Sequence, residues 1–490
     1  MHEITEMSLV ELQERLTSTE LTAEEATARY IDRIESYSFA GPKLNAVREL
    51  NPEAMSIAAD LDRERREGLV RSPLHGVPIL LKDNMGTDDT MATTAGVKAL
   101  ETLRTPFDAA LARKLRAAGA VILGKCSCPD FCDYMSSAMP SEHSSTGGTI
   151  GHPYGLRYER GGGSSTGVAA AVAASMAAAG IGSETQNSIQ APVCNSAVVG
   201  IKATVGLVSR AGMVPLAITQ DTAGPIARTV RDAAILLSAI VGPDPDDPMT
   251  LTGAGAFEAD YSAFCVSSAL VGARIGVARR AFFGKEGKTE IDSVVESAVA
   301  AMRSAGAVIV DPADISTAEV VMPLASCVFR TDFKAGLNNF LARCCDRTAM
   351  RDMRQIVEYN IANDSTAIPF GQDLLIAAES TAGDWSEVDY HDDRARDVRL
   401  CREEGIDHTL RSFDLDAIVV PMDHAAKLTG KAGYPAVSVP CGFTSDGTPV
   451  GITFIGTAWS EAKLIALAFA FEQISLARKP PTALGGEVQN

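Results

Sequence analysis

Two short polar patterns near the start of the chain predict helices. Ser8 with Glu11 and Thr22 with Glu25 each fit the S/T-x-x-E capping box, in which a hydroxyl and a carboxylate satisfy backbone N–H groups at a helix start. Spaced Leu, Val, Ala, Tyr and Ile residues follow both boxes, as in helices with one apolar face. We therefore expect N-terminal helices packed on the surface of the main body.

Apolar runs of strand length alternate with helical periodicity further along the chain. GVPILL (76–81), AVIL (120–123) and AVVGIKA (197–203) are strand-like, and residues 108–119 have the spacing of an amphipathic helix. Strands that alternate with helices favour an α/β fold built in layers.

A break in composition separates this part from the remainder. Residues 242–256, GPDPDDPMTLTGAGA, are rich in Pro, Gly and Asp, which predicts a long surface connection. A largely helical stretch is expected from about 316 to 412. The other predicted elements are strands at ARIGVA (273–278), AVIV (307–310), AIVVP (417–421), YPAVSVP (434–440) and PVGITFIG (449–456), and a last helix at about 460–477.

Composition and charge narrow the class of protein and its partners. The chain has 490 residues, 46% hydrophobic and 22% charged, which is typical of a soluble globular protein with an ample core. A formal net charge of −18 repels nucleic acid and anionic membranes, so we expect neither as a partner. The opening MHEITEM lacks the basic and apolar regions of a secretory signal, so we expect reduced cysteines and a cytoplasmic location. The longest apolar run, residues 168–181, is too short to span a membrane.

Several familiar motifs are present only in part. GSSTG matches G-x-S-x-G around Ser165, but the residues before it are too polar for the buried strand that this elbow requires. GAVILGKC resembles a phosphate loop, yet its interior is strand-like. Cys126, Cys128 and Cys132 lack the second ligand pair of a zinc site, so we interpret them as buried cysteines. The seven histidines include no metal-binding pair, and we expect no metal and no cofactor.

Three stretches carry the best candidates for catalysis. Lys82 follows the strand-like GVPILL, where α/β folds place site residues, and a lysine acts as a base only in its neutral form, which burial favours. Ser164 precedes an Ala-rich run, residues 168–179, that predicts a slim, wholly buried helix ended by Gly180. Ser188 lies in the polar turn of GSETQNSIQAP, with no histidine near it in sequence. Taken singly, each also fits a bland interpretation: a surface lysine, a glycine–serine turn, an ordinary loop serine.

Together these stretches resemble the amidase signature family of hydrolases. The match follows the family's order through most of the chain and weakens between about 265 and 410. The resemblance implies an α/β fold with a large mixed β-sheet sandwiched between helices and with the N-terminal helices packed on this core. The matching stretches are LHGVPILLKDN (74–84), TTAG (93–96), GGSSTGVAAAVAAS (162–175), GSETQNSI (182–189), VVGIKATVGLVSRAGMVP (198–215), DTAGPIARTVRDAA (221–234), AGYPAVSVPCGF (432–443) and PVGITFIGTAWSE (449–461).

The resemblance assigns roles to three side chains. It implies a Ser-cisSer-Lys triad of Lys82, Ser164 and Ser188, with a cis peptide bond at Ser164. The interval 188 − 164 = 24 agrees with the family's spacing. In the implied mechanism Lys82 draws the proton of Ser188 through the Ser164 hydroxyl, and Ser188 attacks an amide carbonyl to form an acyl-enzyme that water cleaves.

The turn before Ser188 departs from the family pattern. The resemblance implies an oxyanion hole made by the backbone N–H groups of Thr185, Gln186, Asn187 and Ser188. The family usually has Gly immediately before the nucleophile, and often two, where this chain has Gln186 and Asn187. Asn tolerates left-handed backbone angles well, so we expect the turn to form with a narrowed or more polar pocket. Gln190 replaces an Arg that many relatives carry.

We expect a single amidase domain over residues 1–490. Its expected parts are an N-terminal helical part (1–70), a core with the triad (71–241), a variable, largely helical part that shapes the pocket (265–410) and a C-terminal part that completes the core (411–490).

The expected activity is hydrolysis of a small-molecule carboxylic amide, acting on non-peptide or small amide C–N bonds. Two other functions stay open: acyl transfer to an amine or alcohol in a biosynthetic pathway, and a non-catalytic binding protein on the same fold. The acidic surface and the AGYPAVSVP and TAWSE patterns disfavour a third, the glutaminase component of a tRNA amidotransferase. A homodimer also stays open, because relatives are often dimers.

Overall fold

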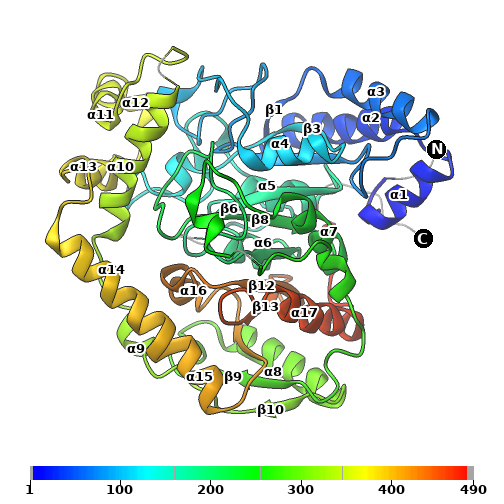
Figure 1. The fold of residues 1–490 in the computed structure, drawn as a ribbon, viewed down its shortest axis with the longest axis vertical. Helices are drawn as coiled ribbons and strands as arrows, with labels where there is room; N and C mark the ends of the chain where they lie inside the picture. Colours follow the sequence, from blue (N-terminus) through cyan, green and yellow to red (C-terminus); the bar gives the residue numbers. More distant parts are fainter. Residues whose placement is uncertain (1–3, 159–161, 254, 345, 483–490) are drawn as a thin grey trace.

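A mixed sheet of eleven strands crosses the centre of the molecule (Figure 1). The computed structural model describes residues 4–158, 162–253, 255–344 and 346–482. A separate hairpin pairs β4 (His143–Ser144) with β5 (Gly148–Thr149). In spatial order the large sheet contains β1 (Val47–Leu50), β3 (Val121–Cys126), β2 (Pro78–Lys82), β6 (Ala179–Glu184), β8 (Thr222–Ala227), β7 (Val199–Lys202), β12 (Ala436–Phe443), β13 (Pro449–Ile455), β11 (Ala417–Pro421), β9 (Arg274–Val277) and β10 (Val308–Val310).

Strand direction in this sheet decides which chain segments meet. β2 pairs in parallel with β3 and with β6, so the ends of β2 and β6 lie at the same edge. β6 is antiparallel to β8, with Glu184 opposite Thr222, which brings the segment before β8 next to the segment after β6. The mixture of parallel and antiparallel pairs confirms the predicted mixed sheet, and strands form at each of the predicted strand-like runs.

Helices pack on the sheet in groups. α5 and α6 contact each other and the central strands. α4, α7, α17 and α8 contact one another in succession, and α7 and α17 contact the same central strands. This arrangement confirms the predicted sandwich. The helices are α1 (Leu9–Thr17), α2 (Ala23–Ile34), α3 (Ala54–Arg66), α4 (Ala110–Ala117), α5 (Thr166–Ala173), α6 (Gln190–Asn195), α7 (Val230–Ile240), α8 (Thr289–Ser304), α9 (Ala318–Val321), α10 (Val328–Arg343), α11 (Met353–Ala362), α12 (Asp364–Ala367), α13 (Asp373–Glu379), α14 (Val388–Cys401), α15 (Asp407–Ser412), α16 (Ala426–Ala432) and α17 (Glu461–Ser475).

The N-terminal helices begin where the capping boxes predict. Ser8 caps α1 and Thr22 caps α2, and in both boxes the glutamate three residues later bonds back to the cap. Leu9, Leu12 and Leu16 of α1 are buried, so this helix packs its apolar face on the core as expected.

The prediction of one helix over residues 168–179 is wrong. α5 ends at Ala173, and Ser175 then adopts a left-handed φ of 53°, which turns the chain out of the helix. The Arg33 guanidinium donates to the Ser175 carbonyl at 2.9 Å and so satisfies a backbone acceptor of this turn. The high helix propensity of alanine hid the end of the helix, because Ser175 is the only polar residue near it and neither Gly nor Pro marks it.

The Ala-rich run ends at the central strand β6, whose first residue is Ala179. Gly180, the predicted helix terminator, lies inside this strand, and a Cβ there would come within 2.6 Å of the Val168 side chain. A Cβ at Gly182 would come within 2.7 Å of Ser165 Oγ. Small residues are therefore required in β6 because α5 packs directly on it.

The expected surface connection at 242–256 is only partly exposed in its described residues. Asp247 accepts hydrogen bonds from the Arg210 main chain and Nε, each at 2.8 Å, and Thr250 is buried. The segment contains a 3₁₀ turn, η4 (Pro248–Leu251). Asp244 and Asp247 are buried and bond to Ser209 and Arg210, so this segment packs against the main body at these two residues.

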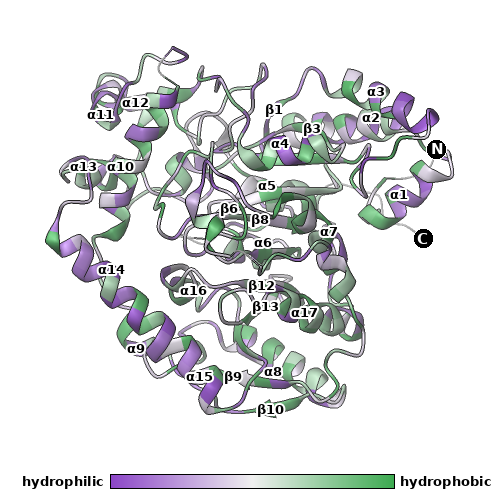
Figure 2. Ribbon diagram, viewed as in Figure 1, coloured by the Kyte–Doolittle hydropathy of each residue, from purple (hydrophilic) through white to green (hydrophobic). Residues whose placement is uncertain are grey.

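The segment predicted to be largely helical forms α9 to α15, along one side of the molecule (Figure 1). Residues of α10, α11 and α13 build a hydrophobic cluster with Phe131, Met135 and Met139, and this cluster is separate from the core on the sheet. Hydrophilic residues are prominent on the outer helix α14, and hydrophobic ones on α17 (Figure 2). No helix in the described ranges is long and apolar enough to cross a membrane.

Candidate active site

Lys82 is the last residue of β2 and is buried. Its Nζ atom lies 2.6 Å from Ser164 Oγ, 3.1 Å from Ser183 Oγ and 3.3 Å from the Ser183 carbonyl. Asn84 donates to the same Ser183 hydroxyl at 3.1 Å. Three oxygen atoms thus surround the amine, so the sequence prediction of a lysine at a strand end, aimed at Ser164, is matched by the geometry.

Ser164 lies just before α5, and the Gly163–Ser164 peptide bond is cis, as the family resemblance implies. Its neighbour Ser165 has another role, because the Ser165 hydroxyl donates to the Ser183 carbonyl and accepts from the Ser183 N–H. Ser165 therefore ties α5 to β6 and is buried, in agreement with the rejection of the G-x-S-x-G elbow.

Ser188 lies in the turn between β6 and α6 and is buried. The Ser165 N–H donates to the Ser188 carbonyl at 2.9 Å, so the main chain of Ser188 is joined to the residue that follows Ser164. The Glu184 carboxylate accepts from the N–H groups of Ile189 and Gln190 at 2.7 and 2.9 Å, and these hydrogen bonds stabilise the turn. The chain thus brings Lys82, Ser164 and Ser188 into one buried region.

The turn itself is held by two side-chain contacts with the segment before β8. Thr185 Oγ1 donates to Asp221 at 2.6 Å, and Gln186 Nε2 donates to Gln220 Oε1 at 3.2 Å. In the part of the chain that the structure describes, the backbone N–H groups of Gln186 and Ser188 donate to no protein acceptor. An N–H group without an acceptor in a fixed turn is the feature that an oxyanion hole needs.

Gln190 has a structural explanation. Its amide donates to Glu184 at 2.5 Å and to Thr429 Oγ1 at 3.2 Å. Burial raises the pKa of Glu184 to about 7, and the nearby charge of Lys202 opposes this rise. Lys202 thus supplies the positive charge beside Glu184 without an arginine at position 190.

Two residues near the site were missed by the sequence reasoning. A hydrogen bond with Cys128 lowers the pKa of Cys132 to about 7, with further lowering from Lys82 and from a hydrogen bond with Ser164. Cys132 is therefore near Lys82 and Ser164, whereas the sequence predicts only that it is buried. The three cysteines are buried as predicted. In the described residues, no three His, Cys, Asp or Glu side chains are grouped so that they could hold a metal ion.

Gly430 of α16 is the second missed residue. A Cβ at this position would lie 2.6 Å from the Thr185 carbonyl and 2.7 Å from Gln186 Cα. The glycine therefore lets α16 lie directly against the turn that carries Ser188. The sequence offered the weak signal of a glycine inside a helical stretch, LTGKAG, which usually has a packing reason.

Known proteins match this chain over most of its length. The family model described as Amidase matches residues 25–432. The native peptide amidase from Stenotrophomonas maltophilia superimposes with a TM-score of 0.91 at 40% identity, over 97% of this chain and 98% of that one. A probable amidase from Arabidopsis thaliana is 35% identical over 98% of this chain and 92% of its own. A component of the glutamyl-tRNA(Gln) amidotransferase from Ralstonia pickettii is 32% identical over 96% of this chain and 98% of its own.

The sheet, the helices around it and these likenesses define an enzyme of the amidase class. The chain belongs to the amidase signature family, which confirms the resemblance found in the sequence. Its reaction is hydrolysis of the C–N bond of carboxylic amides.

Proposed function

We propose that this enzyme hydrolyses small carboxylic amides with Ser188 as nucleophile, Ser164 as proton relay and Lys82 as base. The observation that carries the proposal is the buried 2.6 Å contact between Lys82 Nζ and Ser164 Oγ, beside the turn that holds Ser188. The base contacts one hydroxyl, and a second hydroxyl lies in the adjoining turn. This arrangement can activate a serine without a histidine.

In the proposed reaction, neutral Lys82 accepts the Ser164 proton while Ser164 accepts that of Ser188. Ser188 Oγ bonds to the amide carbon, and the N–H groups of Gln186 and Ser188, with those of Thr185 and Asn187, bind the oxyanion. The proton returns through Ser164 to the departing amine as the C–N bond breaks. Water then attacks the acyl-enzyme by the same relay, releasing the carboxylic acid and restoring the Ser188 hydroxyl.

Small non-peptide amides are the proposed substrate class. The likeness to a peptide amidase adds the amides of short peptides as a second class. We also propose that the protein is one domain that acts in the cytoplasm, alone or as a homodimer. Its acidic charge disfavours nucleic acid and membrane partners.

The decisive experiment compares ammonia release from primary amides by the wild type and by Ser188→Ala. We expect turnover by the wild type and a loss of at least about 10³-fold in Ser188→Ala. Equal rates in the two proteins would disprove the proposed nucleophile. Added hydroxylamine tests acyl transfer, because a hydroxamate product in place of the acid would favour a transferase.

Glutaminase activity within a larger assembly is the second candidate, favoured by the likeness to the component of a glutamyl-tRNA(Gln) amidotransferase. Glutamine hydrolysis by the isolated chain distinguishes the two. We expect glutamine to be a poorer substrate than neutral aryl or alkyl amides.

A further inference from the structure

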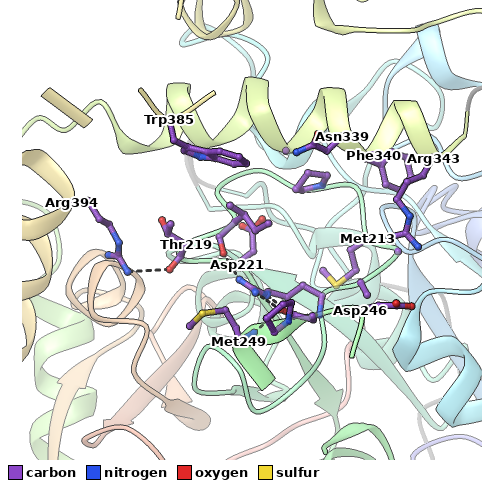
Figure 3. A pocket seen from close by; sticks show the side chains of 18 residues that line it. Met213, Thr219, Asp221, Asp246, Met249, Asn339, Phe340, Arg343, Trp385 and Arg394 are labelled. Carbon is purple, nitrogen blue, oxygen red and sulfur yellow. Dashed lines mark hydrogen bonds and ion pairs between the residues drawn. The ribbon is translucent and has the colours of Figure 1, made fainter. Parts of the chain in front are cut away.

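A cavity of about 530 Å³ lies below α10 (Figure 3), and none of the three candidate triad residues lines it. One wall is residues 210–221, called here the pocket loop, and a second is the segment 246–249. Figure 3 shows α10 crossing above the cavity, with Phe340 and Arg343 of this helix and the nearby Trp385 on that side. This side of the cavity therefore comes from residues 265–410, the part of the chain where the family resemblance is weakest.

The pocket loop is bonded to both catalytic segments. Val214 N–H donates to the Asn84 carbonyl at 2.7 Å, which fixes the loop two residues after Lys82. At the other end of the loop, Asp221 accepts from Thr185 Oγ1 at 2.6 Å, three residues before Ser188. Because Asp221 lines the cavity and also bonds to Thr185, the cavity lies against the turn that carries Ser188.

The lining favours an uncharged occupant. Its charged side chains are three arginines and three aspartates, so their formal charges cancel. Arg210 is paired with Asp247, and Arg394 donates to the backbone carbonyls of Thr219 and Lys431 at 3.2 and 2.9 Å. Large apolar side chains make up much of the rest: Met213, Pro215, Ile218, Met249, Phe340 and Trp385.

One buried carboxylate, that of Asp332, joins the α10 side of the cavity to the pocket loop. Asp332 of α10 accepts from Trp385 Nε1 at 2.9 Å and from the Tyr390 hydroxyl at 2.8 Å. Its other oxygen accepts from Thr219 Oγ1 at 2.6 Å, on the pocket loop. The indole of Trp385 is therefore held in place at the cavity, as a preformed binding surface requires.

We propose that this cavity is the specificity subsite for a bulky, uncharged apolar group of the substrate, such as a phenyl or branched alkyl group. The inference deepens, and rests on, the proposed amide hydrolysis at Ser188. It names the substrate class as amides that carry such a group within a few bonds of the scissile carbonyl, with Trp385 and Ile218 as specificity-determining residues.

The kinetic experiment narrows the cavity with a larger side chain at an exposed lining residue. Ile218 is 38% exposed, so Ile218→Trp adds volume there without disturbing the core. Ile361 on α11, 62% exposed and outside the lining, gives the matched control Ile361→Trp. We expect Ile218→Trp to lower kcat/KM for 4-phenylbutyramide at least about tenfold and to change it less than about twofold for acetamide. The same loss for both amides, or an equal loss in Ile361→Trp, would overturn the subsite.

A binding experiment separates failure of the subsite from failure of the proposed reaction. The chain has two tryptophans, so Trp459→Phe leaves Trp385 as the only one. In Ser188→Ala with Trp459→Phe, we expect 4-phenylbutyramide to shift Trp385 emission in a saturable way and acetamide to leave it unchanged. If wild type hydrolyses no amide but this shift occurs, the subsite stands and the proposed reaction falls. Absence of the shift overturns the subsite whatever the turnover.

Discussion

Lys82 Nζ lies 2.6 Å from Ser164 Oγ, although 82 residues separate the two in the chain. The parallel pairing of β2 with β6 and the packing of α5 on β6 together bring them into contact. The buried amine is therefore positioned by the central sheet, and any change that moves α5 relative to β2 acts first on its contact with Ser164.

Removal of any one member of the triad should cost nearly as much as removal of two. We expect Lys82→Ala, Ser164→Ala and Ser188→Ala each to lower kcat/KM by at least about 10³-fold, with the double variants close to the single ones, because the three groups act as a unit. Steady-state ammonia release measures this, and additive losses in the doubles would contradict the relay.

Lys125 provides the matched control for Lys82. It is also buried, but it donates to the Met85 carbonyl and to Thr93, away from the candidate triad. Lys125→Met should lower thermal stability while the folded protein keeps a kcat near that of the wild type.

The candidate triad is easier to read from the sequence than the contacts around it. Lys82, Ser164 and Ser188 lie in short motifs whose order and spacing are readable along the chain. The contacts of Cys132 and Gly430 with the site depend on long-range packing, between segments that no local pattern connects. The prediction of one helix over the Ala-rich run failed for a local reason. Alanine fits both a buried helix and a tightly packed strand, so the pattern does not separate them.

A methyl group at position 430 should disturb catalysis more than binding. Gly430→Ala would push its Cβ against the Thr185 carbonyl and Gln186 Cα, at 2.6 and 2.7 Å. We expect kcat to fall about 10- to 100-fold with little change in KM, because small displacements of an oxyanion turn are costly. As a comparison, Gly447→Ala meets no atom within 4 Å and should lose some stability through its φ of 86° while kcat is kept.

Asp332→Asn should loosen the pocket loop. The new amide NH₂ would face the donors of Thr219, which bond to Asp332 Oδ2 at 2.6 and 3.2 Å. We expect a loss of about 1–3 kcal/mol in the free energy of unfolding and a larger fall in kcat/KM for bulky amides than for acetamide. Urea unfolding and the two kinetic assays measure these effects. Asp389→Asn, on the exposed surface of α14, should change neither.

Burial of His152 predicts a loss of stability in acid. Burial lowers the pKa of His152 to about 4, and its Nδ1 accepts from the Tyr154 N–H at 3.2 Å, which requires the neutral ring. A folded pKa below the unfolded value of about 6.5 means that this stability is fully present above pH 6.5 and is lost as pH falls towards 4. We expect about 2–3 kcal/mol to be lost over this window.

Urea midpoints at pH 7.5 and 4.5 test this effect. His152→Gln should be less stable at pH 7.5 yet show a smaller drop between the two pH values. The exposed His391→Gln should retain the pH dependence of the wild type. An unchanged drop in His152→Gln would exclude His152 as its source.

The separate hydrophobic cluster of α10, α11 and α13 makes this part of the chain a natural unit for recombination. Its apolar partners outside these helices fall mainly in short segments such as 95–103, 131–139 and 214–216. A chimera that exchanges α10 to α14 between relatives, with these partner segments transferred as well, leaves intact the strand that carries Lys82 and the turn that carries Ser188. Directed evolution of selectivity can therefore be confined to one contiguous stretch and its few partners.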